Sequence, residues 1–111
     1  MRPKEVFLSH SSENGAMAAR IAETIRCHGI PVWFSPTDMI VSQLWIEEVG
    51  RSLRRCDWFM LLLSPAAIDS IWVKRELSYA LIHNQYNDSI MPVLIEPCEY
   101  EELSWTLGSF H

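Results

Sequence analysis

Long apolar runs and paired cysteines are scarce in this chain of 111 residues. The longest apolar run, Trp58 to Leu63, is too short to span a bilayer, so no membrane partner is expected. The cysteines Cys27, Cys56 and Cys98 are odd in number and lack CxxC spacing. This argues against a disulfide framework and a structural zinc site, and three reduced thiols favour a cytoplasmic protein.

An excess of positive charge is also missing, because the formal net charge is -5. The basic residues are scattered, apart from the short run Arg51, Arg54 and Arg55. Bulk positive charge is what recruits a phosphate backbone, so nucleic acid is not an expected partner. We interpret the arginine run as a solvated helix face, with a contact to a partner as the alternative.

Several α/β chemistries are excluded by motifs that the chain lacks. A phosphate-cradling loop needs glycines after the first strand, where only Gly15 is available and already belongs to a helix. A nucleophile elbow needs G-x-S-x-G, which is absent. A phospho-acceptor domain would carry an aspartate where this chain has Ser64. Ser9 and His10 are neighbours in a strand and point to opposite faces, so they are a poor nucleophile–base pair.

Short apolar segments alternate with amphipathic segments along the chain. This alternation predicts an α/β fold, a three-layer parallel sheet with helices on both faces. In such a sheet the ligand crevice lies beyond the carboxyl ends of the strands. Pro92 fits a strand at the edge of the sheet or the start of a strand. The expected strands are Val6–Leu8, Pro31–Phe34, Trp58–Leu63 and Ile90–Ile95, and the expected helices cover 13–28, 45–55 and about 70–83.

The helix that we expect after Ser70 carries the strongest candidate for chemistry. Trp72, Glu76 and His83 share one stripe of it, and Glu76 lies at the boundary between the core face and solvent. A carboxylate beside a tryptophan at a crevice edge is partly desolvated, which suits a catalytic carboxylate. The simpler alternative is a solvated charged turn at 74–76, with Trp72 serving only in packing.

Taken together, these segments resemble a TIR domain of the bacterial kind, through nearly the whole chain and in the right order. The stretch Trp72–Leu77 matches the Trp-x-x-x-Glu pattern that carries the family's catalytic glutamate. Four other stretches resemble the family's first box, its second strand, its third strand with the exit, and the region before its last strand: 6–11, 31–34, 56–65 and Ser104–Trp105.

The resemblance implies a flavodoxin-like fold and an activity. The family contains enzymes that cleave the nicotinamide–ribose bond of NAD and scaffolds that assemble with other TIR domains. A glutamate in its motif favours an NAD nucleosidase of bacterial immune or stress signalling, activated by self-assembly with other TIR domains. Fused or partner sensor and effector domains are further implied partners. NAD is then the substrate, and no cofactor or metal is expected. The alternative is a non-catalytic TIR–TIR interaction module.

Individual residues receive roles from the same resemblance. It implies Glu76 as the catalytic carboxylate, Trp33 as an aromatic residue near the nicotinamide and Trp72 as a wall of the site. By position it also implies His10 and Ser11 at the mouth of the site. Core packing is the alternative role for Trp33, and a surface or hydrogen-bonded histidine is the alternative for His10.

Two departures from the family pattern bear on these expectations. The loop 35–44 usually carries a glycine before the helix, and here Ile40-Val41-Ser42-Gln43 has none, which puts the assembly geometry in question. The family would continue into a fifth strand and a closing helix after the fourth strand. We therefore expect one TIR-like domain over residues 1–111, truncated at its C-terminal end.

Overall fold

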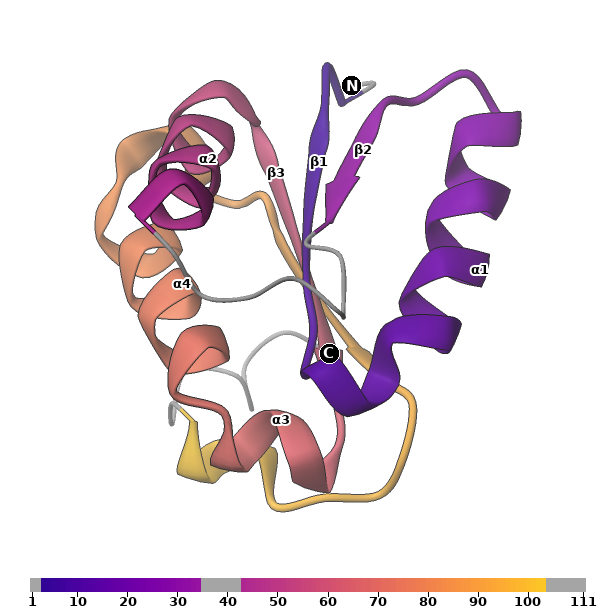
Figure 1. Cartoon of the computed structure of the whole chain (residues 1–111), viewed down its shortest axis with the longest axis vertical. Helices are drawn as coiled ribbons and strands as arrows, with labels where there is room; N and C mark the ends of the chain where they lie inside the picture. Colours follow the sequence, from indigo (N-terminus) through magenta and orange to yellow (C-terminus); the bar gives the residue numbers. More distant parts are fainter. Residues whose placement is uncertain (1–2, 35–42, 104–111) are drawn as a thin grey trace.

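The computed structural model describes residues 3–34 and 43–103, and within them four parallel strands form one sheet. The strand order is β2-β1-β3-β4, so the chain moves first to one side of β1 and then crosses to the other. Figure 1 shows the strands between helices on either side. The strands are β1 (Val6–Ser9), β2 (Val32–Phe34), β3 (Trp58–Leu63) and β4 (Ile90–Leu94), and the helices are α1 (Gly15–Cys27), α2 (Gln43–Arg55), α3 (Pro65–Asp69) and α4 (Ile71–Ile82).

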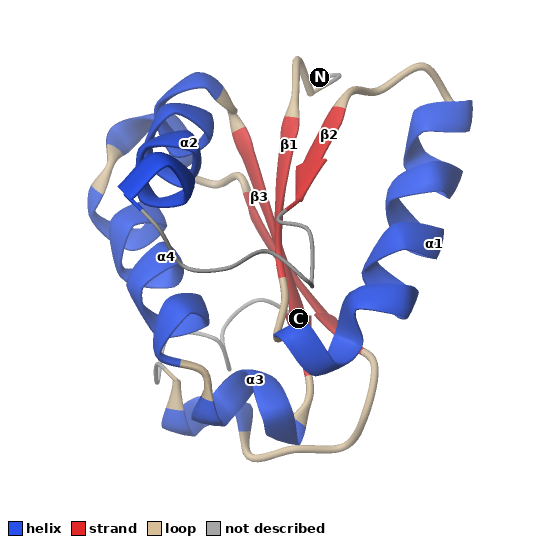
Figure 2. Ribbon diagram, in the orientation of Figure 1, coloured by secondary structure: helices blue, strands red, loops and turns tan. Residues whose placement is uncertain are grey.

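The helices divide between the two faces of the sheet, as the sequence predicts. Helix α1 covers one face, and α2 and α4 cover the other (Figure 2). Side chains alternate along β1: Val6 and Leu8 join the core beneath α1, whereas Phe7 joins the core beneath α2 and α4. Ser9 continues this alternation and therefore lies on the α4 side.

Small residues set the contact between α1 and the sheet. Met17, Ile21 and Ile25 recur every four residues along α1, yet Met17 is 37% exposed and the two isoleucines are only half-buried. Ala18 and Ala22 are fully buried instead. Their short side chains bring the helix close to the strands, and the larger residues flank that contact.

Capping residues fix where three of the helices begin or end. Gly29 follows α1 with a φ of 81°, the left-handed conformation that the sequence predicts there. Ser70 accepts a hydrogen bond from the Val73 N–H and begins α4, also as predicted. Ser64 caps α3 through the Ala67 N–H, with Pro65 in the first turn. The expected helices do not include α3, because its 5 residues span little more than one turn and carry almost no periodic pattern.

The amino end of the sheet is tied together by hydrogen bonds. The Gln85 amide, in the turn Asn84–Tyr86 after α4, donates to the carbonyl oxygens of Leu53, Arg54 and Cys56 at 2.8–3.0 Å. These carbonyls lie at and just after the C-terminal end of α2, where helical partners run out. The turn therefore joins the end of α4 to the end of α2.

The β4 strand lies at one edge of the sheet in the described residues, which is where Pro92 is tolerated. Pro92 is in register with Leu61 of β3. In the described ranges no helix is long and apolar enough to cross a membrane. Two features from the sequence, residues 35–42 of the glycine-free loop and Ser104–Trp105, lie outside the described residues.

Candidate active site at the carboxyl end of the sheet

The carboxyl ends of β1 and β3 lie side by side at the point where the chain changes direction across the sheet. Ser9 ends β1 and pairs in register with Leu61, and Ser64 follows directly after β3. In open parallel sheets ligands bind at this kind of switch point, because the loops on either side diverge and leave a crevice. The residues that surround it are therefore candidates for function.

Glu76 reaches this end of the sheet from α4 and meets β1. The Ser9 hydroxyl donates a hydrogen bond to its Oε1 at 2.7 Å, across 67 positions of sequence. Both side chains are buried, with 6% of Glu76 and 1% of Ser9 exposed. Glu76 is thus deeper than the core–solvent boundary that helical periodicity predicts. It lies on the packed face of α4 that also carries the buried Val73 and Leu77.

Burial changes the acidity of this carboxyl group. It raises the pKa of Glu76 to about 7, because the charged form loses hydration, and the hydrogen bond from Ser9 offsets only part of the effect. An ordinary glutamate would be fully ionised at neutral pH. Glu76 instead carries a proton in about half of the molecules there, a property shared by many catalytic carboxyl groups.

Two tryptophans lie on the same side of the sheet as this carboxyl group. Trp72, one turn earlier on α4, packs edge-on against Trp45 of α2 with ring centroids 4.6 Å apart. Arg75 lies over the Trp72 ring at 4.9 Å from its centroid. Trp33 lies on the same sheet face as Ser9, with its ring 5.1 Å from that of Phe7, and remains half-buried. The structure therefore places both predicted tryptophans on the side of the sheet that carries Glu76.

His10 and Ser11 contact different parts of the molecule. The His10 ring lies 5.9 Å from Phe34, whose neighbours belong to the α1 side of the sheet, and its Nδ1 lies 2.7 Å from the Ser11 carbonyl oxygen. The buried Ser11 hydroxyl accepts a hydrogen bond from the Glu13 N–H and caps the turn before α1. His10 and Ser11 directly follow β1 at its carboxyl end, and their described contacts do not include Glu76.

A second polar cluster, which the sequence analysis missed, joins three elements at the same end. The Ser64 hydroxyl donates to the Asn14 Oδ1 at 2.6 Å, and the Asn14 amide donates to Glu96 Oε1 at 3.4 Å. Asn14 thus connects the start of α1 with the exits of β3 and β4. The role of Ser9 could have been suspected from the sequence, because strand alternation places its hydroxyl on the same face of β1 as the apolar Phe7. For Asn14 no sequence signal indicated these partners.

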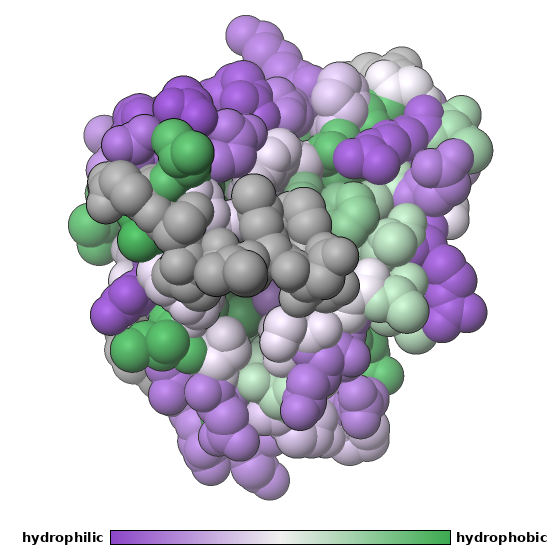
Figure 3. Space-filling view, viewed as in Figure 1, coloured by the Kyte–Doolittle hydropathy of each residue, from purple (hydrophilic) through white to green (hydrophobic). Residues whose placement is uncertain are grey.

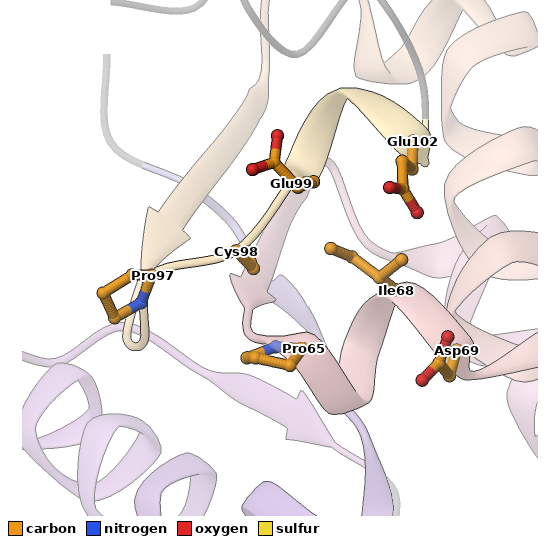
Figure 4. Close-up of a pocket in the computed structure, with 7 residues that line it drawn as sticks. All are labelled: Pro65, Ile68, Asp69, Pro97, Cys98, Glu99 and Glu102. Atoms are coloured by element: carbon orange, nitrogen blue, oxygen red, sulfur yellow. The ribbon is translucent and has the colours of Figure 1, made fainter.

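A hollow lies near this end of the sheet, between α3 and the segment after β4. In Figure 4, Ile68 and Cys98 point toward one another, with carboxyl groups around them. The pKa of the Cys98 thiol is raised by burial and by neighbouring carboxylates, so it stays protonated and a poor nucleophile. None of the predicted site residues lines this hollow, whose lining is Pro65, Ile68, Asp69, Pro97, Cys98, Glu99 and Glu102.

The described residues contain no group of three or more histidine, cysteine or acidic side chains arranged to hold a metal ion. Within the same ranges, the three cysteines are free thiols. A family model described as the TIR domain matches residues 6–110. No curated protein matches the chain closely enough to count as a relative.

Proposed function

The chain belongs to the TIR domain family, and from that membership we propose that it is an NAD nucleosidase with Glu76 as its catalytic carboxylate. The family supports a role in signalling, and it includes both NAD-cleaving and non-catalytic members. One observation carries the choice of the enzyme: a buried carboxyl group at the carboxyl end of the sheet, held by one serine and with its pKa near 7. A purely structural glutamate would gain nothing from this burial.

The chemistry requires one carboxylate and no acid partner. When the bond between the ribose C1′ and the nicotinamide nitrogen breaks, its electron pair leaves with the nitrogen, and the cationic pyridinium becomes neutral nicotinamide. The ribose then passes through an oxocarbenium-like state. An ionised Glu76 stabilises this positive centre electrostatically. Water adds to C1′ and releases its proton to solvent, which gives ADP-ribose; capture by another nucleophile gives a cyclic or conjugated product.

The raised pKa of Glu76 gives this reaction a pH dependence. The carboxylate form is the active one, so the rate should rise as the pH passes through about 7. The cationic nicotinamide ring of bound NAD favours the ionised form and shifts that rise to lower pH. The ionised fraction of Glu76 therefore increases when the cationic substrate binds.

The aromatic residues supply the surface that a nicotinamide ring needs. Trp33 and Trp72 are half-buried on the Glu76 side of the sheet and offer flat apolar faces. The hollow beside α3 is a poor alternative site, because Asp69, Glu99 and Glu102 would repel the diphosphate of a dinucleotide. The proposed binding surface is thus the carboxyl end of the sheet on its α4 side, with His10 and Ser11 at the edge.

The test is nicotinamide release from NAD, measured at high protein concentration because the family resemblance implies activation by self-assembly with other TIR domains. We expect Glu76→Ala to lose about a hundredfold or more of the rate, the scale for removing one electrostatic stabiliser. The matched control is Glu23→Ala, which removes an exposed glutamate from α1 on the far face. If Glu76→Ala and Glu23→Ala both keep the parent rate, Glu76 is not catalytic.

A second function, a non-catalytic interaction module, is favoured by the apolar side chains that reach the surface of the helices. Leu44, Ile71 and Ile82 are 75%, 56% and 78% exposed, and Figure 3 shows apolar spots among hydrophilic residues over the helices on its left. A contact with another domain would remove such exposed apolar side chains from water. This function predicts no nicotinamide release at any concentration, together with TIR–TIR binding that survives Glu76→Ala.

A further inference from the structure

We propose that Ser9 is a positioning residue for Glu76, and that its hydroxyl holds the carboxylate in the orientation that the reaction uses. This inference rests on the proposed function, since it assigns Ser9 a task in the same site. The direct contact is the hydrogen bond of 2.7 Å between the Ser9 hydroxyl and Glu76 Oε1. No part of the family pattern in the sequence assigned Ser9 such a task.

The surroundings of Ser9 show how exceptional a hydroxyl is at this position. On the same face of the sheet, the neighbouring inward positions of β1 and β3 are Phe7, Phe59, Leu61 and Leu63, all of them apolar and buried. A hydroxyl buried among such side chains costs free energy unless it has a hydrogen-bond partner. Glu76 is that partner. The hydrogen bond therefore offsets part of the free-energy cost of burying each of the two side chains.

The position of Ser9 in the sheet also restricts the orientation of the Glu76 carboxyl group. Ser9 is the last residue of β1, so its backbone is held by β3 on one side through the register with Leu61. A carboxylate has about four lone-pair positions on its two oxygens. One hydrogen bond from a fixed strand restrains the rotation of the Glu76 side chain and leaves the remaining positions for ribose hydroxyls or a cationic centre. An orientation fixed in advance is what electrostatic catalysis requires.

Among the described residues, no charged side chain holds the Glu76 carboxyl group in place of Ser9. Burial and Ser9 are the causes of the shifted pKa of Glu76 among the described residues. The elements packed against α4 do carry charged groups, but none contributes to that shift. These are Glu47, Glu48, Arg51, Arg54 and Arg55 on α2 and Asp69 on α3, with Lys74 and Arg75 on α4 itself and His10 and His83 next to β1 and α4.

The experiment compares Ser9→Ala and Ser9→Cys with the parent by two measurements. Titration of Glu76 in isotope-labelled protein by NMR gives its pKa directly, without any need for catalysis. Loss of one hydrogen bond to a charged group should raise that pKa by about one unit in Ser9→Ala. Ser9→Cys should give a smaller rise, because a thiol is a weaker donor of nearly the same shape.

The second measurement is nicotinamide release as a function of pH. Ser9→Ala should lower kcat/KM roughly fivefold at pH 7 and recover much of it at pH 9, because kcat/KM follows the titration of the free site. Ser52→Ala is the matched control, because Ser52 is also fully buried but lies on α2 beside Arg55. It should leave both the Glu76 titration and the pH profile unchanged.

The outcomes separate the two proposals. An unchanged Glu76 pKa in Ser9→Ala, or an equal loss of rate at every pH in Ser9→Ala and Ser52→Ala, would overturn the role of Ser9. If even the parent releases no nicotinamide, the proposed function fails, and the titration alone decides whether Ser9 holds the carboxylate. If Ser9→Ala does not fold, Ser9→Cys provides the same comparison with almost no change in volume.

Discussion

The two ends of the sheet use their polar groups differently. At the amino end, the Asp57 carboxylate accepts the backbone N–H groups of Lys4 and Glu5, and the Arg55 guanidinium holds the Glu5 carboxylate at 2.8 and 3.0 Å. Gln85 satisfies three carbonyl oxygens there. These groups are partly exposed and fasten strands and helices together. At the carboxyl end, a carboxyl group is buried with one hydroxyl donor and an altered pKa.

This difference separates groups that stabilise the fold from a group that destabilises it. Exposed or part-buried hydrogen bonds at helix and strand ends contribute modest stability without changing any charge state. A buried carboxylate costs stability whenever it is ionised. Proteins tolerate such a cost mainly at functional sites. The amino end therefore stabilises the fold, whereas the proposed chemistry belongs to the carboxyl end, and three stability measurements test this contrast.

The largest expected effect is on the stability of Glu76→Gln as a function of pH. The folded pKa of Glu76, about 7, lies above its ordinary value of 4.5, so the folded parent binds more protons between these values and loses stability as the pH rises through them. Glutamine carries no such cost. Glu76→Gln should match the parent near pH 4 and exceed its free energy of unfolding by roughly 3 kcal/mol at pH 8.

Urea unfolding at pH 4, 6 and 8 measures this difference. Glu23→Gln serves as the control, because Glu23 is exposed on α1 and should show no growing advantage with pH. A constant difference between Glu76→Gln and the parent across the pH range would mean that the carboxyl group is not destabilising when ionised. The contrast between the two ends would then be lost.

A smaller effect is expected at the amino end from Gln85→Ala. The substitution leaves the carbonyl oxygens of Leu53, Arg54 and Cys56 without the amide, and solvent can replace it in part because Gln85 is exposed. The free energy of unfolding should fall by about 2 kcal/mol. Nicotinamide release should keep its rate and pH profile, whereas the exposed neighbour Asn84→Ala should change neither quantity. A loss of rate in folded Gln85→Ala would show that the two ends are coupled.

The smallest effect is expected from the ion pair between Arg55 and Glu5. The Arg55 side chain is 47% exposed and that of Glu5 21%, so water screens much of their attraction. Arg55→Lys should lower the free energy of unfolding by about 0.5 kcal/mol, and the difference should shrink further at high salt. Thermal unfolding at low and high salt measures it. If the free energy of unfolding instead fell by several kcal/mol at every salt concentration, the pair would stabilise the fold far more than exposed ion pairs usually do.

Much of the fold could be predicted from the sequence, because its signals are local. The strand segments, the Ser70 cap and the turn at Gly29 follow from residue types within a few positions. Helix α3 was missed because five residues carry almost no periodic signal. Residue spacing in α1 does not show which of two adjacent rows contacts the sheet, the row with Met17 or the row with Ala18 and Ala22.

The candidate site was harder to predict, because its contacts join distant residues. Glu76 was found through its motif, but its depth and its partner depend on how α4 packs against the end of β1. Asn14, Ser64 and Glu96 come from three separate elements that only the fold brings together. Sequence patterns identify a candidate residue more readily than the partners that tune it.

Pro92 has a consequence for how copies of the domain can associate. The Phe59 N–H donates to the Ser89 carbonyl and the Ile95 N–H to the Leu63 carbonyl, so residues 89, 91, 93 and 95 of this edge face β3 and the intervening ones face outward. Pro92 is one of the outward residues and has no N–H. A strand that extended the sheet here would lose a hydrogen bond in the middle of the new ladder. Pro92 thus weakens any backbone pairing along this edge of the described sheet, so contacts made there depend more on side chains.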